Sequence, residues 1–222
     1  MTAELITLIA NVWDVLRSNS RWMTWNLFLA FVPLALSLWL FRGKLRRSSL
    51  WWFGFLVFLA FLPNAPYVLT DVIHLYEDIR AINSVWMITL VVIPVYLLFI
   101  TAGFEAYVLS LINLGYYLNR IGQGKWILWV ELIVHSLCAV GIYLGRFQRF
   151  NSWDFITQPD ALATSVVEDL LGKRPLVISA ITFVVVAGLY WIMKPLSLAV
   201  TPAKTYAHPY PTANDQDRLP KG

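Results

Sequence analysis

The sequence has little charge and almost no cysteine. Its single cysteine, Cys138, excludes an intrachain disulfide and a cluster of metal-bound thiolates. Charged residues make up only 14% of the 222 residues, well below the share in an ordinary soluble domain. The zinc-protease motif HExxH, the nucleophile-elbow motif GxSxG, a Walker lysine and a dinucleotide-binding glycine motif are also absent. These common catalytic and nucleotide-binding sites are therefore excluded, and we expect no metal, no cofactor and no nucleic-acid partner.

Hydrophobic residues are abundant instead. They make up 59% of the chain, and its mean hydropathy is +0.63. Both values are typical of a protein that crosses the membrane several times. We therefore predict an all-α, polytopic membrane helix bundle with about five transmembrane helices. The expected spans are residues 22–41, 50–70, 85–103, 126–144 and 175–200.

The same patterns divide the chain into three parts. Residues 1–20 have apolar side chains at helical spacing, which predicts an amphipathic helix at the membrane interface. Residues 21–200 form a single membrane domain, in which the third apolar pattern continues past Gly103 to Tyr117 and predicts a tilted or bent helix. Residues 201–222 are rich in proline and polar residues, which predicts a disordered cytoplasmic tail.

Two prolines interrupt the second span. The apolar run 50–62 would cover only ~20 Å as a helix, whereas the hydrocarbon core of a bilayer is about 30 Å thick. Pro63 and Pro66 are therefore expected to break the span inside the membrane, where freed backbone groups must be buried in protein or line a wet cavity. Pro66 is expected to begin a new helix, with Asn64 or Thr70 bonding its free backbone donors.

Basic residues are distributed unevenly between the expected loops. The loop at 42–47 has four basic residues and no acidic residue, and Arg120 and Lys125 flank the turn after the third span. By the positive-inside rule these loops face the cytoplasm. Five alternating spans then place the N-terminus outside and the C-terminus in the cytoplasm.

Polar residues with useful chemistry gather at the opposite, outer end. After the break, Tyr67, Asp71, His74 and Asp78 follow at spacings of four, three and four residues, so they share one helical face. Asn26 lies near the outer start of the first span. A second polar cluster on the same side ends the fourth span and consists of Arg146, Arg149, Asn151, Ser152 and Asp154. Three spans are thus predicted to bring these groups to one level.

These residue types suggest a site for an anionic headgroup. His74 is the candidate general acid or base, Asp71 would orient its imidazole, and Asp154 is the third candidate catalytic residue. Guanidinium groups bind phosphate strongly. The candidate binding residues are Arg146, Arg149, Asn64, Tyr67, Asn26, Asn151 and Ser152. These residues do not decide between binding alone and catalysis.

Glu131 and His135 form a third polar pair, four residues apart on the fourth span. Together with Asp71 and His74 they superficially suggest a metal site. Helical geometry argues against it, because Glu131 is expected to lie ~16 Å or more from Asp71. We therefore predict no metal site.

Two stretches of the chain resemble the motifs of a known family. They are FLPNAPYVLTDVIHL at residues 61–75 and GIYLGRFQRFNSWD at residues 141–154. They match the signatures PNAPY-x-x-TD-x-x-HL and GRF-x-R-x-x-S-x-D of the bacterial membrane family catalogued as domain of unknown function 1361. The resemblance would cover most of residues 22–200. It implies a location in the bacterial cytoplasmic membrane and a shared outer-face signature, and it implies no particular reaction.

Three functions compete for these residues. The first is binding or transformation of an anionic lipid or polyprenyl-phosphate headgroup, with membrane lipids as the partners. The second is a non-enzymatic scaffold or assembly subunit, in which ion pairs such as Asp71–Arg149 or Asp154–Arg146 hold helices together. The third is a small-solute transporter, which the broken span suggests but the odd number of spans and the absence of an internal repeat disfavour. We favour the first, and the sequence does not determine an oligomeric state.

Overall fold

The computed structural model describes residues 2–43, 47–147, 157, 160 and 173–200, and every regular element within them is helical, as predicted. In chain order the helices are α1 (Thr2–Ser37), α2 (Ser49–Phe61), α3 (Asn64–Tyr67), α4 (Val72–Ala81), α5 (Val85–Met87), α6 (Ile93–Arg120), α7 (Ile127–Phe147) and α10 (Lys173–Val200). The shorter helical segments are the π-helical η1 (Leu38–Arg42) and η3 (Ile88–Val92) and the 3-10 helical η2 (Val68–Asp71) and η4 (Gly124–Trp126).

Five helical segments in this part of the chain are long and apolar enough to cross a membrane, which confirms the predicted number. They are Asn19–Arg42, Ser49–Ala81, Val85–Arg120, Gly124–Arg146 and Arg174–Val200. The protein is therefore a multi-pass integral membrane protein. The second span extends beyond its predicted range, because helical structure continues through the polar residues after Thr70, and the third continues to Arg120, close to the predicted end of its apolar pattern at Tyr117.

The predicted N-terminal helix is not a separate element. α1 begins at Thr2 and continues without interruption into the first span. No break falls near residue 20 because the sequence there offers neither glycine nor proline, and the first proline of α1 is Pro33. The location of residues 1–20 at the membrane interface stays a prediction.

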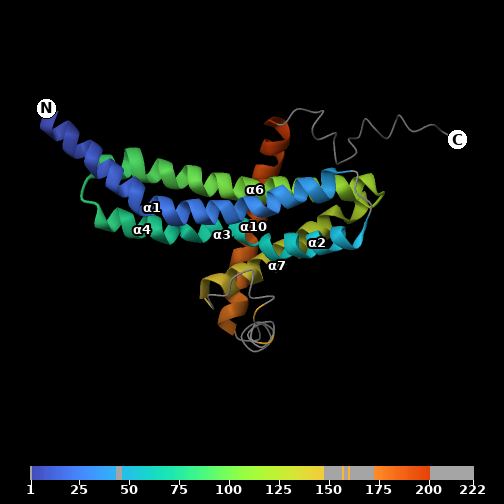
Figure 1. Ribbon diagram of the computed structural model, residues 1–222. Coiled ribbons are helices and arrows are strands. Elements are labelled where there is room, and N and C mark those ends of the chain that lie inside the picture. The colour runs from blue at the N-terminus through green and yellow to red at the C-terminus, as the bar shows by residue number, and fades with distance from the viewer. Residues whose placement is uncertain (1, 44–46, 148–156, 158–159, 161–172, 201–222) are drawn as a thin grey trace.

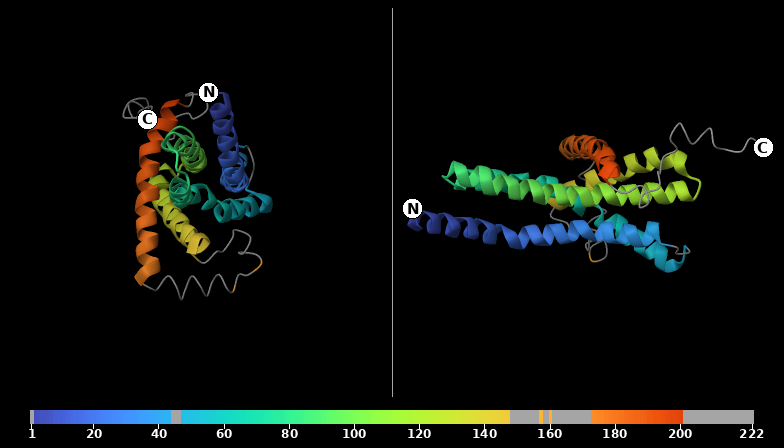
Figure 2. Two further views of the ribbon diagram at one scale, coloured as in Figure 1. Left: turned by 90° about the vertical axis from the view of Figure 1, so that its left-hand side faces the viewer. Right: turned by 90° about the horizontal axis from the view of Figure 1, so that it is seen from above.

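The spans do not all share one direction. α1, α6 and the segment from α2 to α4 run alongside one another, with α7 returning from the end of α6 (Figure 1). α10 crosses this group steeply, as two further views make clear (Figure 2). Polar contacts attach α10 to α7, since the Tyr190 hydroxyl and the Lys194 ammonium both donate to Glu131 Oε1 at 2.7 Å.

The proline break is partly covered by protein, since Pro63 and Asn64 are half-buried. Leu62 and Val68 on either side of the break are almost fully buried. A Cβ added at Gly141 of α7 would lie 2.8 Å from the Pro63 ring, and one added at Gly103 of α6 would lie 2.8 Å from the Val68 side chain. Both glycines thus allow α6 and α7 to approach the broken segment closely. α6 continues as an α-helix through Gly103.

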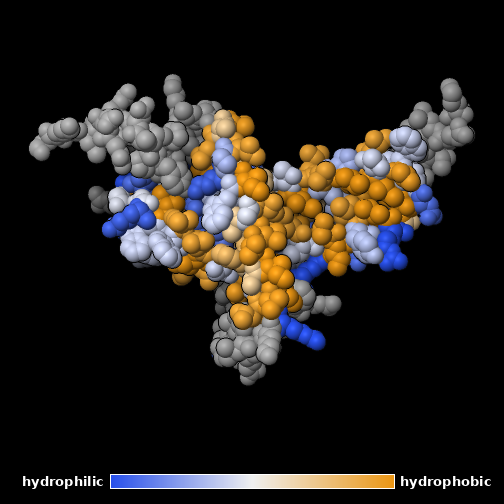
Figure 3. Space-filling view, turned by 180° about the vertical axis from the view of Figure 1, so that it is seen from behind, coloured by the Kyte–Doolittle hydropathy of each residue, from blue (hydrophilic) through white to orange (hydrophobic). Residues whose placement is uncertain are grey.

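The surface agrees with a membrane environment. Large apolar side chains are exposed on all five spans, for example Phe28, Phe53, Leu98, Trp129 and Val184. Hydrophobic surface covers much of the middle of the molecule, and hydrophilic surface lies towards its ends (Figure 3). Such a distribution fits a protein whose apolar middle contacts lipid tails and whose ends meet water.

We predict that Gly103→Ala destabilises the protein, because the new methyl group would overlap the Val68 side chain. Overpacking of this kind costs ~1–3 kcal/mol. Gly188→Ala is the matched control, since a Cβ there meets nothing within 4 Å and alanine favours a helix by ~0.5–1 kcal/mol over glycine. Thermal unfolding of the purified protein in detergent should show a lower Tm for Gly103→Ala alone. Equal Tm values for the two variants would contradict the close packing.

Candidate functional site

The site begins where the chain resumes its helix after the break. α3 starts at Asn64 with Pro63 at its N-cap, two residues earlier than the predicted start at Pro66. The Asn64 side-chain amide donates to the Phe61 carbonyl, and the Thr70 hydroxyl donates to the Tyr67 carbonyl. The 3-10 segment η2 then carries the chain from α3 into α4 and ends at Asp71.

Asp71 is the centre of the site. It is only 1% exposed, although it is a charged residue in a membrane-spanning segment. The Asn26 amide of α1 donates to Asp71 Oδ2 at 2.9 Å, and Nη1 of Arg146 from α7 lies 3.7 Å from Oδ1. The predicted convergence of the first, second and fourth spans at these residues is therefore found in the structure. Buried charges of this kind require a partner, and Arg146 supplies it.

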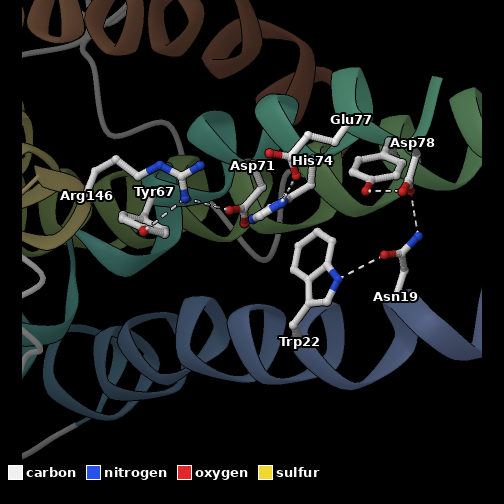
Figure 4. Close-up of polar contacts among 9 residues, drawn as sticks. Asn19, Trp22, Tyr67, Asp71, His74, Glu77, Asp78 and Arg146 are labelled. Carbon is white, nitrogen blue, oxygen red and sulfur yellow. Dashed lines mark hydrogen bonds and ion pairs between the residues drawn. The ribbon is translucent and has the colours of Figure 1, made fainter. Parts of the chain in front are cut away.

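Arg146 is held by long contacts. Besides its ion pair with Asp71, its Nη1 donates to the Tyr67 hydroxyl at 3.4 Å, and its guanidinium carbon lies 6.0 Å from the centre of the Tyr67 ring. Both polar distances exceed that of a strong charge-assisted hydrogen bond. The Arg146 side chain remains 24% exposed. The close-up shows the guanidinium between Tyr67 and Asp71 (Figure 4).

His74 has a different partner from the one expected. Its Nδ1 lies 3.1 Å from Glu77 Oε2, one helical turn along α4, so Glu77 and not Asp71 orients the imidazole. The other contact of the ring is aromatic, with its centre 4.8 Å from that of Trp22 on α1. Asp71 lies between Arg146 and His74 (Figure 4). No hydrogen bond joins Asp71 and His74 in the described part of the chain, although the two groups are close enough to interact electrostatically.

Asp78 extends the polar row towards the end of α4. Its Oδ2 accepts from the Asn19 amide at 2.6 Å and from the Tyr96 hydroxyl at 3.0 Å. Asn19 in turn accepts from the Trp22 indole nitrogen at 3.0 Å (Figure 4). Sequence reasoning did not find Asn19, Trp22 or Tyr96. Helical spacing could have revealed Asn19 and Trp22, because residues 19, 22 and 26 share one face of a continuous α1.

Four of the predicted site residues lie outside the described part of the chain. They are Arg149, Asn151, Ser152 and Asp154. Their predicted roles in binding and catalysis stay predictions. Of the second cluster, Arg146 alone is placed at the site by the structure.

Glu131 and His135 belong to a separate buried cluster between α6, α7 and α10. Glu131 accepts from Tyr190 and Lys194, and His135 Nδ1 lies 2.6 Å from the Tyr107 hydroxyl. None of these contacts reaches Asp71 or His74. Among the described residues, no three histidine, cysteine or acidic side chains are grouped as metal ligands would be.

We predict that Asn26→Ala lowers stability, because Asp71 Oδ2 would lose its donor in a nearly dry environment. An unsatisfied buried acceptor costs ~1–3 kcal/mol. Asn119→Ala, at an exposed asparagine in the same membrane domain, is the matched control. Thermal unfolding in detergent should show a clear fall in Tm for Asn26→Ala and little change for the control. An unchanged Tm for Asn26→Ala would contradict the role of Asn26 as the support of Asp71.

Comparison with known proteins places the chain in a family. The model of the family described as "Protein of unknown function (DUF1361)" matches residues 25–187. This range contains the proline break, Asp71 and Arg146, and it agrees with the resemblance that the two motifs indicated. No curated protein and no solved structure matches the chain. The chain therefore belongs to the family of proteins of unknown function DUF1361.

Proposed function

We propose that the protein binds the phosphate of an anionic lipid or polyprenyl-phosphate headgroup at the Arg146 guanidinium. This proposal rests on the exposure and the long polar contacts of the Arg146 side chain. The side chain is 24% exposed, and its polar contacts are two long ones, both made through Nη1.

The donors of Arg146 suit a phosphate group. A guanidinium has five N–H donors arranged in a planar fork, which matches two oxygens of a phosphate. The contacts of Arg146 with Tyr67 and Asp71 use only Nη1. Its Nε and Nη2 therefore have the capacity to donate to a ligand, and charge-assisted bonds of this type are about twice as strong as neutral ones. The Tyr67 hydroxyl lies beside the same fork as a further polar contact.

Asp71 and Asn26 act as positioning residues in this account. Asp71 holds the guanidinium at one edge, and Asn26 holds Asp71. A negative charge next to an anion site weakens the attraction for the anion, so the carboxylate must lie behind the guanidinium. Its burial is consistent with that place, because Asp71 is 1% exposed whereas the Arg146 side chain is 24% exposed. The arginine thus separates the carboxylate from an incoming phosphate.

We propose binding rather than a defined reaction. His74 is the nearest candidate acid or base, but it pairs with Glu77 and stacks on Trp22, on the far side of Asp71 from Arg146 (Figure 4). A general acid or base needs hydrogen-bond reach to the reacting group. The arrangement of Arg146 and His74 therefore supports a binding role more directly than catalysis by His74.

A scaffold function is the second candidate, and one observation favours it. Asn26, Asp71 and Arg146 come from α1, η2 and α7 and meet at a single buried carboxylate. Removing one partner of a buried ion pair is strongly destabilising, at ~3–5 kcal/mol. A contact of this type would hold three spans together without any ligand.

We predict that Arg146→Gln weakens binding of phosphatidylglycerol at least tenfold, because a neutral side chain loses both the charge and the fork. The protein would be placed in phosphatidylcholine nanodiscs with increasing phosphatidylglycerol, and retained lipid would be counted by native mass spectrometry. A long-chain polyprenyl phosphate would be tested in the same way. Arg80→Gln is the matched control, since Arg80 is an exposed arginine that contacts Tyr76 on its own helix.

The scaffold candidate predicts a different result. Folded Arg146→Gln protein would then retain lipid as the wild type does, while its Tm falls. Unchanged lipid binding by folded Arg146→Gln protein would overturn the headgroup proposal. Equal losses of lipid binding for Arg146→Gln and Arg80→Gln would also overturn it, because they would indicate that anionic lipid is attracted to positive charge anywhere on the protein.

A further inference from the structure

Three arginines meet at the end of the bundle where the loop after α1 and the turn after α6 lie. Arg42 ends η1, Arg47 precedes α2, and Arg120 ends α6. The chain brings these distant positions together because α1, α2 and α6 have ends on the same side (Figure 1). Arg120 Nη1 donates to the carbonyl of Gly43, which ties the α6 end to the loop. This group is separate from the Arg146 site, which lies where the α2–α4 segment meets α7.

Each arginine in this group is anchored by a polar contact. Arg42 Nε donates to Asn113 Oδ1 at 2.8 Å, and the Asn113 amide donates to the Ser37 hydroxyl at 2.9 Å. Arg47 Nε donates to the Tyr117 hydroxyl at 2.7 Å. Anchoring through Nε fixes the plane of a guanidinium. Arg42 Nη2 is buried within the protein. Arg47 and Arg120 are both exposed.

Two tyrosine rings form a platform for the three guanidinium groups. The Arg42 guanidinium carbon lies 4.2 Å from the centre of the Tyr116 ring, and that of Arg120 lies 6.0 Å from it. The Tyr117 ring is approached by Arg47 at 5.6 Å and by Arg120 at 5.7 Å. Cation–π contacts at these distances hold the positive charges close together.

No carboxylate in the described part of the chain pairs with Arg47 or Arg120. The ion pairs found there join other residues, namely His74–Glu77, Arg146–Asp71 and Lys194–Glu131. Like charges held around two shared rings repel one another. A flexible arginine at a membrane end would normally extend into water or headgroups. These side chains are instead drawn back onto the protein and fixed there, which favours a preformed site for an anion.

We propose that Arg47 and Arg120, with the half-buried Arg42 beside them, form a second anion site, which binds a phosphate group carrying two negative charges, such as a phosphomonoester or a diphosphate. Two exposed guanidinium groups match a doubly charged group better than a singly charged one. The planar forks of Arg47 and Arg120 suit phosphate oxygens. The phosphate comes either from a lipid headgroup in the adjacent leaflet or from a soluble phosphate compound.

The test uses the full-length protein in nanodiscs. Phosphatidic acid supplies the lipid-borne phosphomonoester, and pyrophosphate added to discs of pure phosphatidylcholine supplies the soluble group. The test variant is Arg47→Gln/Arg120→Gln. The matched control is Arg21→Gln/Arg80→Gln, which also removes two exposed arginines. Bound phosphatidic acid is counted by native mass spectrometry, and the rise in Tm with pyrophosphate is measured by thermal unfolding.

We expect wild-type and control proteins to retain one more tightly bound phosphatidic acid than the test variant, with at least a tenfold difference in Kd. A pyrophosphate-dependent rise in Tm that the test variant lacks would assign the site to a soluble phosphate compound. Equal responses of test variant and wild type to both ligands would overturn the site. Equal losses of ligand binding in the test variant and the control would also overturn it, because they would indicate unspecific attraction between the phosphate and any surface arginine.

Two further variants keep the test decisive if the double substitution impairs folding. Arg47→Lys/Arg120→Lys preserves charge but removes the forks, so it should lose most of the binding. Tyr117→Phe preserves the ring but removes the anchor of Arg47, so it should weaken binding severalfold. Full binding by both folded variants would contradict a site built from guanidinium forks. Arg146 is intact in every one of these proteins, so failure here leaves the proposed function of Arg146 unaffected.

Discussion

The buried carboxylate of Asp71 is the interaction on which one half of the bundle depends. A carboxyl group that is 1% exposed in a membrane-spanning segment is costly unless other groups compensate it. Asn26 and Arg146 provide that compensation from two other spans. The break after α2 and the 3-10 turn η2 bring Asp71 to this position. The local backbone, the packing of three helices and the candidate site therefore all involve the Asp71 carboxyl group.

The arginines of the two proposed sites have different partners. At the Asp71 end, a single guanidinium lies against a buried carboxylate and retains donors for a ligand. At the other end, Arg47 and Arg120 lie on tyrosine rings without a described acidic partner. Aromatic faces stabilise cations without neutralising them. Both arrangements hold arginines in fixed positions on helices that are long and apolar enough to cross a membrane.

Helical spacing was sufficient to predict that Asn26, Asp71 and Arg146 meet, because it fixes both the face and the approximate depth of a residue. It was not sufficient for His74, whose side chain has two carboxylates within reach and pairs with Glu77. Asn19 was missed because residues 1–20 were assigned to a separate helix. The steep crossing of α10 was not predicted, because contacts such as Lys194–Glu131 link residues 63 positions apart and leave no periodic signal in the sequence.

The most direct test of the central claim is the distance between the Arg146 guanidinium nitrogens and lipid phosphorus, measured by solid-state NMR in bilayers that contain an anionic lipid. Arginine-labelled wild-type protein would be compared with the Arg146→Gln variant to assign the signal. The account predicts a nitrogen–phosphorus contact at hydrogen-bonding range that disappears in the variant. A wild-type spectrum in which no such contact depends on Arg146 would contradict it.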